Sequence, residues 1–290
     1  MIISYRDTLY TLLFAVLVAN GCAAKKKYAE TNKIHRQHVE EVVAEIAKPL
    51  PPPAVISSTV FPADTLVEGT KHNPEWVGAV HFGLRRPNYV IIHHTAQDSV
   101  GQTLRTFTLP HTEVSAHYLI GKDGRVYQML SDYLRAWHAG RSKWGGVTDM
   151  NSISLGIELD NNGKDPYSEV QLNSLLTLLD TLKTAYRIPP ENFIGHNDIA
   201  PGRKVDPDIN FPWKRLAEHG FGVWYDAELT PPPPTFNPMD GLMIIGYDVS
   251  KPSAAIIAFK RHYLPDAVLN DEWTEFAKAV VYNLYLKKKL

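Results

Sequence analysis

Cysteine is almost absent from this sequence, since Cys22 is the only one among 290 residues. The chain therefore cannot form a disulfide within itself, and a metal site built from several thiolates is excluded. An excess of charge of one sign is lacking as well, because 30 Lys and Arg face 31 Asp and Glu and leave a net charge of -1. We therefore expect no nucleic-acid partner.

The N-terminal apolar run is too short to cross a membrane. Residues 12–19 are apolar, whereas a membrane-spanning helix needs roughly 20 such residues. The run follows Arg6 and precedes Asn-Gly-Cys, which is the layout of a secretory signal. Residues 19–22 resemble a bacterial lipobox, in which the cysteine becomes the lipidated first residue of the mature protein. We expect residues 1–22 to be a lipoprotein signal with lipid on Cys22, and simple secretion with cleavage nearby is the alternative.

Two proline-rich stretches divide the rest of the chain. The first ends a polar segment, residues 23–55, which we interpret as a stiff tether with a short helix around residues 38–47. The second lies in a linker at residues 229–238. It separates a middle domain, residues 56–228, from a tail, residues 239–290.

The middle domain mixes strands and helices. Residues 89–92 and 154–159 predict buried strands, and residues 115–129 predict a hairpin. Leucines at helical spacing over residues 172–182 predict a helix that Pro189 ends. Strands alternating with helices predict an α/β domain with a mixed central sheet flanked by helices.

Several strand-end side chains in this domain could bind a metal or move a proton. They are His93, His94, Glu158, His196 and Asp206. A hydrolytic zinc takes about three protein ligands, for which histidine nitrogen and carboxylate oxygen are suitable. Neighbours in a strand point to opposite faces, so His93 and His94 cannot both face one metal without a bulge. The spacing alone does not select the ligands, and the His-Glu-x-x-His helix of many metalloproteases is absent.

Five motifs in these stretches occur in the order found in one enzyme family. They are His-His-Thr-Ala at 93–96, Ser-Ala-His-Tyr-Leu-Ile at 115–120, Ala-Trp-His-Ala-Gly at 136–140, Ser-Leu-Gly-Ile-Glu-Leu at 154–159 and Gly-His-x-Asp-Ile-Ala-Pro-Gly-Arg-Lys-x-Asp-Pro at 195–207. Over about residues 86–226 the sequence resembles the zinc-dependent N-acetylmuramoyl-L-alanine amidases, whose fold is shared with peptidoglycan recognition proteins.

The resemblance implies one Zn²⁺ per chain, held by His93, His196 and Asp206, with His94 as the rival for the first position. It aligns Glu158 with the family's catalytic acid, a role that suits a carboxylate beside the metal. Lys204 would stabilise the oxyanion that forms at the carbonyl.

The aromatic residues of the third motif region are candidates for substrate contacts. We expect Trp137, His138 and Trp144 to line the substrate groove, and plain packing is the alternative. His117 is also familiar from the family, and a structural role is equally compatible with the sequence.

The tail predicts a small all-α domain. Helical segments are expected around residues 241–245, 252–263 and 271–286. They resemble the three-helix peptidoglycan-binding module that often accompanies these amidases, and a helical cap that stabilises the catalytic domain is the alternative.

The resemblance implies hydrolysis of the amide between an N-acetylmuramoyl, or anhydro-muramoyl, group and L-alanine in peptidoglycan. The expected partners are peptidoglycan or muropeptides and, through Cys22, a membrane. We expect a monomer in the periplasm, anchored to the outer membrane because Ala23 is not the aspartate associated with inner-membrane retention. Two other functions stay open: a muropeptide-binding module of the same fold without activity, and a zinc peptidase acting within the stem peptide.

Overall fold

The structure is a computed structural model that describes residues 28–46 and 86–289. The chain divides into two units, Met1–Phe82 and Gly83–Leu290. The expected signal and Cys22 lie outside the described residues. Among the residues that are described, no helix combines the length and apolar character needed to span a membrane.

The first unit contains one described helix, α2 (Ala29–Ile46). It begins earlier than the helix that we expected around residues 38–47. Apolar residues are sparse along it, and Ile34 and Val43 are more than half exposed. It therefore contributes no core of its own.

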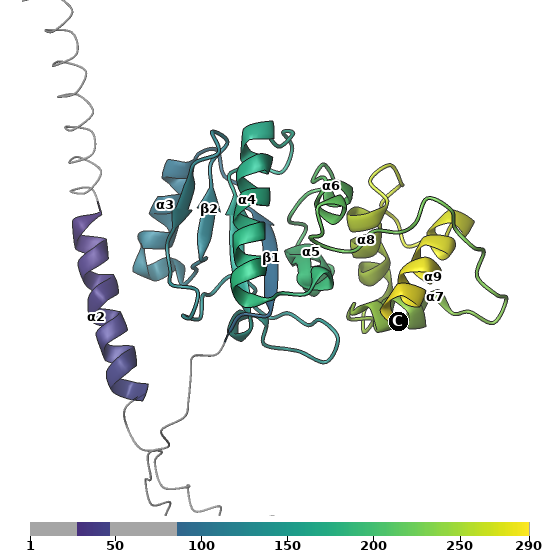
Figure 1. The fold of residues 1–290 in the computed structure, drawn as a ribbon, viewed down its shortest axis with the longest axis horizontal. Coiled ribbons are helices and arrows are strands. Elements are labelled where there is room, and N and C mark those ends of the chain that lie inside the picture. Colours follow the sequence, from purple (N-terminus) through teal and green to yellow (C-terminus); the bar gives the residue numbers. More distant parts are fainter. Residues whose placement is uncertain (1–27, 47–85, 290) are drawn as a thin grey trace, which may run out of the picture. The chain divides into compact units, whose positions relative to one another are not determined.

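The second unit is built on a five-stranded sheet with strand order β3-β2-β4-β1-β5 (Figure 1). The strands are β1 (Tyr89–His94), β2 (Tyr118–Ile120), β3 (Val126–Gln128), β4 (Ser154–Leu159) and β5 (Phe193–Gly195). β1 pairs in parallel with β4 and β5, β2 pairs in parallel with β4, and β3 is antiparallel to β2. The expected hairpin is β2 and β3, and the predicted mixed sheet with flanking helices is confirmed.

Alternation along the central strands gives the sheet two different apolar faces. On one face, Val90 and Ile92 pack with the buried leucines of α4 (Glu169–Tyr186). The Ser168 side chain accepts a hydrogen bond from the Gln171 backbone N–H, which satisfies an amide group in the first turn of α4. This is the leucine helix expected from the sequence.

Shorter helices lie in the connections between these elements. They are α3 (Val100–Thr108), α5 (His196–Ile199), α6 (Trp213–Glu218), and the 3-10 turns η2 (Pro110–Thr112), η3 (Met150–Ser152) and η4 (Pro190–Asn192).

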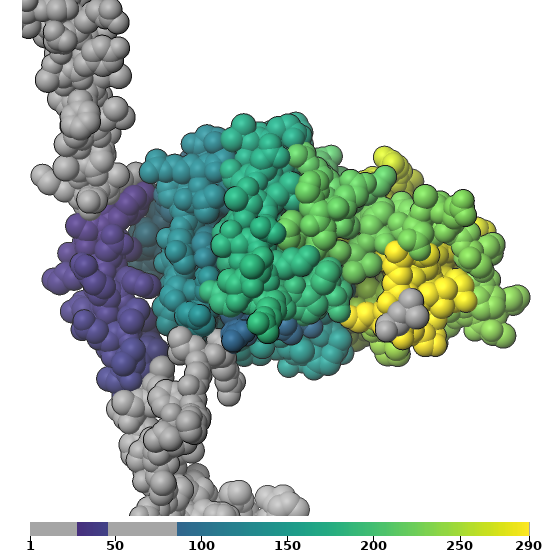
Figure 2. All heavy atoms as spheres, in the orientation of Figure 1, coloured from purple at the N-terminus to yellow at the C-terminus, as the bar shows by residue number. Residues whose placement is uncertain are grey.

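Three helices, α7 (Pro238–Ile245), α8 (Pro252–Tyr263) and α9 (Glu275–Lys289), form the C-terminal segment. Their apolar side chains share one buried cluster with Ile91 and Ile194, which point to the sheet face opposite α4. In Figure 2 the green and yellow atoms of this segment adjoin the teal part of the same unit. The C-terminal helices thus pack against the sheet of the domain that precedes them.

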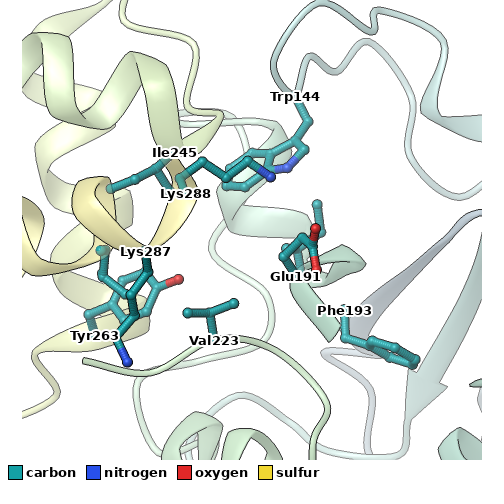
Figure 3. A pocket seen from close by; sticks show the side chains of 10 residues that line it. Trp144, Glu191, Phe193, Val223, Ile245, Tyr263, Lys287 and Lys288 are labelled. Atoms are coloured by element: carbon teal, nitrogen blue, oxygen red, sulfur yellow. The ribbon is translucent and has the colours of Figure 1, made fainter. Parts of the chain in front are cut away.

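A cavity of about 220 Å³ remains at the seam between this segment and the sheet. Figure 3 shows Trp144 and Phe193 on one side of it and Tyr263 on the helical side. Lys287, Lys288 and Glu191 also line it.

Candidate active site

Three side chains far apart in the sequence converge at the end of β1. The Nδ1 atoms of His93 and His196 are 2.9 Å apart, and Asp206 Oδ2 lies 3.0 Å from the first and 2.9 Å from the second. All three residues are buried. They form a potential metal-binding group with one ligand atom from each residue.

Local structure explains why these three side chains meet. His93 lies near the end of β1 and His196 is the first residue of α5, directly after the neighbouring strand β5. The Asn197 backbone N–H donates to the Asp206 carbonyl at 2.7 Å, which brings the loop after α5 back to the first ligand pair. Candidate ligands from the end of β1, the start of α5 and one returning loop therefore face the same point.

The outward nitrogen of each ligand histidine already has a partner. His196 Nε2 lies 3.1 Å from the Ala139 carbonyl, which can only accept, and 3.3 Å from Arg203 Nη2, which can only donate. With Nε2–H donating to the carbonyl, the nearer of the two partners, Nδ1 keeps its lone pair. His93 Nε2 lies 3.0 Å from His138 Nδ1. With Nε2–H of His93 as donor, its Nδ1 lone pair also points at the cluster.

His138 is able to accept that hydrogen bond. Its Nε2 lies 3.3 Å from Ser154 Oγ, and the Ser154 hydroxyl donates to the Met150 carbonyl at 2.6 Å. His138 therefore carries its proton on Nε2 and accepts at Nδ1. Such partners fix the tautomer and ring orientation of metal-ligating histidines.

The electrostatics also suit a cation. Burial, reinforced by the neighbouring His196, lowers the pKa of His93 to about 4, so the ring is neutral at physiological pH. Burial favours the neutral form of Asp206, but the proximity of the His196 and His93 rings outweighs it and holds the pKa of this carboxyl well below its usual range. Two imidazole nitrogens and a carboxylate oxygen match the donor set of a hydrolytic zinc site, and their convergence fits Zn²⁺.

His94 points to the other face of β1, as strand alternation requires. The Asp208 backbone N–H donates to His94 Nδ1 at 3.1 Å, and the Tyr167 hydroxyl donates to Asp208 Oδ2 at 2.7 Å. The structure thus brings His93 to the cluster and gives His94 a separate hydrogen-bonding role.

Glu158 and Lys204 line the same cavity as the three candidate ligands, with a volume of about 330 Å³. Glu158 Oε2 is buried, and among the described residues it has no hydrogen-bond partner. Burial, and to a lesser degree the charge of Asp206, raises the pKa of Glu158 to about 8, while Lys204 acts in the opposite direction. An unpartnered carboxyl oxygen beside a candidate metal site is available to a substrate or a water.

The three expected substrate-contacting residues have different surroundings. Trp137 lines the active-site cavity with 57% of its surface exposed, and the Arg135 guanidinium lies 4.0 Å from its ring centroid. His138 lines the cavity too, but its side chain contacts the candidate ligand His93. Trp144 lies outside this cavity, in the seam of Figure 3, with its ring centroid 5.0 Å from that of Tyr247.

Sequence reasoning did not foresee the role of His138 as the partner of His93. Gly156 carries a signal for it, because a Cβ atom there would lie 2.5 Å from the His138 ring. A glycine inside an apolar strand often marks such a close approach. His117 has the structural role left open above, since the Gly156 backbone N–H donates to its Nδ1 and its Nε2 contacts the Leu134 carbonyl.

Known proteins resemble this chain over the region just described. A family model described as N-acetylmuramoyl-L-alanine amidase matches residues 83–209. N-acetylmuramoyl-L-alanine amidase AmiD of Escherichia coli (strain K12) is 36% identical over 214 residues, which cover 62% of this chain and 76% of that protein. The chain belongs to the N-acetylmuramoyl-L-alanine amidase family. The activity expected from its motifs is thereby confirmed.

Other members of this amidase family match over shorter or longer stretches. The 1,6-anhydro-N-acetylmuramyl-L-alanine amidase AmpD of Enterobacter cloacae is 41% identical over 108 residues, covering 37% of this chain and 58% of that protein. Among solved structures, Escherichia coli AmiD with a bound substrate has a TM-score of 0.62 at 32% identity, covering 75% of this chain and 94% of that one. AmpDh3 from Pseudomonas aeruginosa has a TM-score of 0.65 at 27% identity, covering 76% and 99%. The match to both structures extends beyond the sheet into the C-terminal half of the chain.

Proposed function

We propose that this amidase is zinc-dependent and that His93, His196 and Asp206 hold the metal. The observation that carries the proposal is the convergence of three lone-pair donors within 3.0 Å of one another. In the tautomers assigned above, both Nδ1 atoms are unprotonated, so without a cation the three atoms would repel each other. Zinc bound there would supply a Lewis acid and lower the pKa of a coordinated water to about 7.

We assign the proton transfers to Glu158. A carboxylate in this position takes the proton of the attacking water and delivers it to the nitrogen of the leaving L-alanine. Its pKa of about 8 in the metal-free protein shows how strongly burial opposes its charge, so it holds a proton readily. The approach of a cation would favour the carboxylate, which is the form that accepts the first proton.

Lys204 completes the proposed machinery. It lines the cavity with Glu158, and it is close enough for its charge to affect the pKa values of both Glu158 and His93. An ammonium group there would stabilise the negative charge that develops on the carbonyl oxygen as water adds.

We infer that anhydro-muropeptides are among the substrates. The AmiD structure from Escherichia coli contains anhydro-N-acetylmuramic acid-L-Ala-D-gamma-Glu-L-Lys, and AmpDh3 from Pseudomonas aeruginosa was solved with an anhydromuramic pentapeptide. The exposed ring of Trp137 at the cavity offers an apolar surface for a sugar or peptide. His138 also lines this cavity and stays a candidate substrate contact, whereas Trp144 does not line the cavity.

We further propose that the protein is a monomer that acts in the periplasm, anchored to the outer membrane by lipid on Cys22. The lipobox-like sequence at residues 19–22 supports this proposal. Metabolic labelling with a fatty acid should label the wild type and not Cys22→Ser. Label that persists on the variant would refute the anchor.

Mass analysis of the products from one purified anhydro-muropeptide tests the proposed function. Free peptide beginning at L-alanine, formed only by protein that contains zinc, is the expected result. Shortened stem peptides would indicate a peptidase instead, and unchanged substrate with measurable binding would indicate a recognition module.

A further inference from the structure

We propose that Tyr247 and His262, in the C-terminal helical segment, are positioning residues for the metal centre. They act through Asp198 on the turn that carries His196. The inference rests on the proposed zinc site and assigns the C-terminal helices a part in building it.

Asp198 is the centre of this connection. Two residues after His196 and only 1% exposed, it accepts hydrogen bonds at both carboxylate oxygens. Its Oδ2 accepts from the Gly195 backbone N–H at 2.8 Å and from His262 Nδ1 at 2.7 Å. Its Oδ1 accepts from the Tyr247 hydroxyl at 2.8 Å. One buried carboxylate thus closes the turn around His196 and joins it to two C-terminal side chains.

Asn197 provides a second connection from the same turn. Its backbone N–H donates to the Asp206 carbonyl at 2.7 Å, which links the segments of two candidate ligands. Its side-chain Nδ2 donates to the Ala258 carbonyl of α8 at 3.0 Å, and Arg261 Nη1 donates to its Oδ1 at 2.8 Å. Both residues that follow His196 are therefore hydrogen-bonded to the C-terminal segment.

Packing prevents the turn from moving independently of α8. The rings of Trp213 and His262 stack with centroids 4.0 Å apart and an interplanar angle of 12°. A Cβ atom on Gly195 would lie 3.0 Å from both Trp213 and Pro207, so no space is left beside the residue that precedes His196. His262 is held by stacking on Trp213 and by its hydrogen bond to Asp198. A displacement of His262 would therefore displace the turn.

Residues outside the ligand set influence a metal site by orienting its ligands. Loss of the Tyr247 hydroxyl or the His262 donor would leave an oxygen of the buried Asp198 without that partner. The turn would relax toward other partners, and His196 Nδ1 would no longer be held at its present distance from the other two ligands. Replacement of such supporting groups typically weakens metal affinity by about 10- to 100-fold.

The test compares zinc affinity with stability in the full-length protein. Zinc dissociation constants would be measured by competition with a chelator of known affinity, and thermal midpoints on the metal-free protein. Tyr247→Phe removes only the hydroxyl, and His262→Leu removes the donor. We expect zinc affinity to fall by about 10-fold or more in each. His262→Asn, whose amide can replace Nδ1 as donor, should recover part of the loss.

Val281→Ala is the matched control. Val281 is fully buried in the same apolar cluster but belongs to α9, and no hydrogen bond joins its side chain to the turn. It should lower the thermal midpoint and leave zinc affinity unchanged. Wild-type affinity in Tyr247→Phe and His262→Leu would overturn the inference, and so would an equal loss of affinity in Val281→Ala. Failure of the wild type to bind zinc would instead refute the proposed function itself.

Discussion

His93 on β1 and Glu158 on β4 are register partners in adjacent parallel strands. Paired residues of parallel strands point to the same face of the sheet, and neighbouring strands are about 4.8 Å apart. A proposed metal ligand and a proposed acid–base group therefore originate side by side from two rigid strands. Their roles are nevertheless different, and substitution should separate them.

The adjacent histidines of β1 provide a matched pair for the metal site. His93→Ala should lose bound zinc and activity together, because it removes one of three proposed ligands. His94→Ala should retain zinc, since this side chain bonds to Asp208 on the other face of the strand. Metal content by plasma spectrometry measures both. Zinc retained in His93→Ala and lost in His94→Ala would reverse the ligand assignment.

Glu158→Ala should keep near-stoichiometric zinc but hydrolyse the substrate much more slowly than the wild type. A positioned acid or base typically contributes 10²- to 10⁴-fold to a rate, so we expect a loss of roughly that size in kcat on one defined muropeptide. Metal content is measured on the same preparation. Loss of zinc from this variant would mean that the carboxylate serves the metal rather than the proton transfer.

Lys204→Ala should also retain zinc. Removal of one group that stabilises a developing oxyanion typically costs about 10²- to 10³-fold in kcat. Lys204→Arg keeps the charge and should recover part of the rate. If the alanine variant has the kcat of the wild type and only a raised KM, Lys204 binds substrate without stabilising the transition state.

The raised pKa of Glu158 predicts a pH dependence of stability in the metal-free protein. Burial, with a smaller contribution from Asp206, raises this pKa to about 8, above the ordinary value that applies in the unfolded chain. The folded protein therefore holds more protons between these two pKa values, and its stability falls as the pH rises through that interval. Glu158→Gln removes this contribution.

Denaturant unfolding of the metal-free variant and wild type at pH 4 and pH 8 measures the effect. The variant's advantage in free energy of unfolding should be larger at pH 8 than at pH 4 by an amount on the order of 4 kcal/mol. Zinc should reduce this difference, because a nearby cation stabilises the carboxylate. An advantage that is the same at both pH values would show that Glu158 ionises normally.

Truncation before Pro231 tests whether the catalytic domain needs the C-terminal helices for stability and zinc binding. The composition of the linker suggested a separable tail, whereas Phe259 and Tyr247 share a buried cluster with Ile91 of the central sheet. Removal of the helices would expose this face of the sheet. We expect a protein with a lowered thermal midpoint and little bound zinc. A truncated protein with wild-type stability and turnover would show that the tail is an independent module.

The sequence by itself determined the class of the fold and the family. Apolar runs and helical leucine spacing are local patterns, and they placed β1, β4 and α4 close to their observed bounds. The alternation of side chains in a strand likewise required that His93 and His94 point to opposite faces. Such features depend on neighbours in the sequence, so they can be recognised without the fold.

The family resemblance grouped His93, His196 and Asp206, but only the tertiary structure explains how such distant residues meet. His93 and His196 are 103 positions apart, and their approach depends on the pairing of β1 with β5. Trp144 lies in the C-terminal seam because its indole packs with Tyr247, a contact that local sequence does not encode. Asp198 and His262 are joined by the same kind of long-range packing. These contacts form when two apolar surfaces are buried together, and no spacing within either segment specifies their partner.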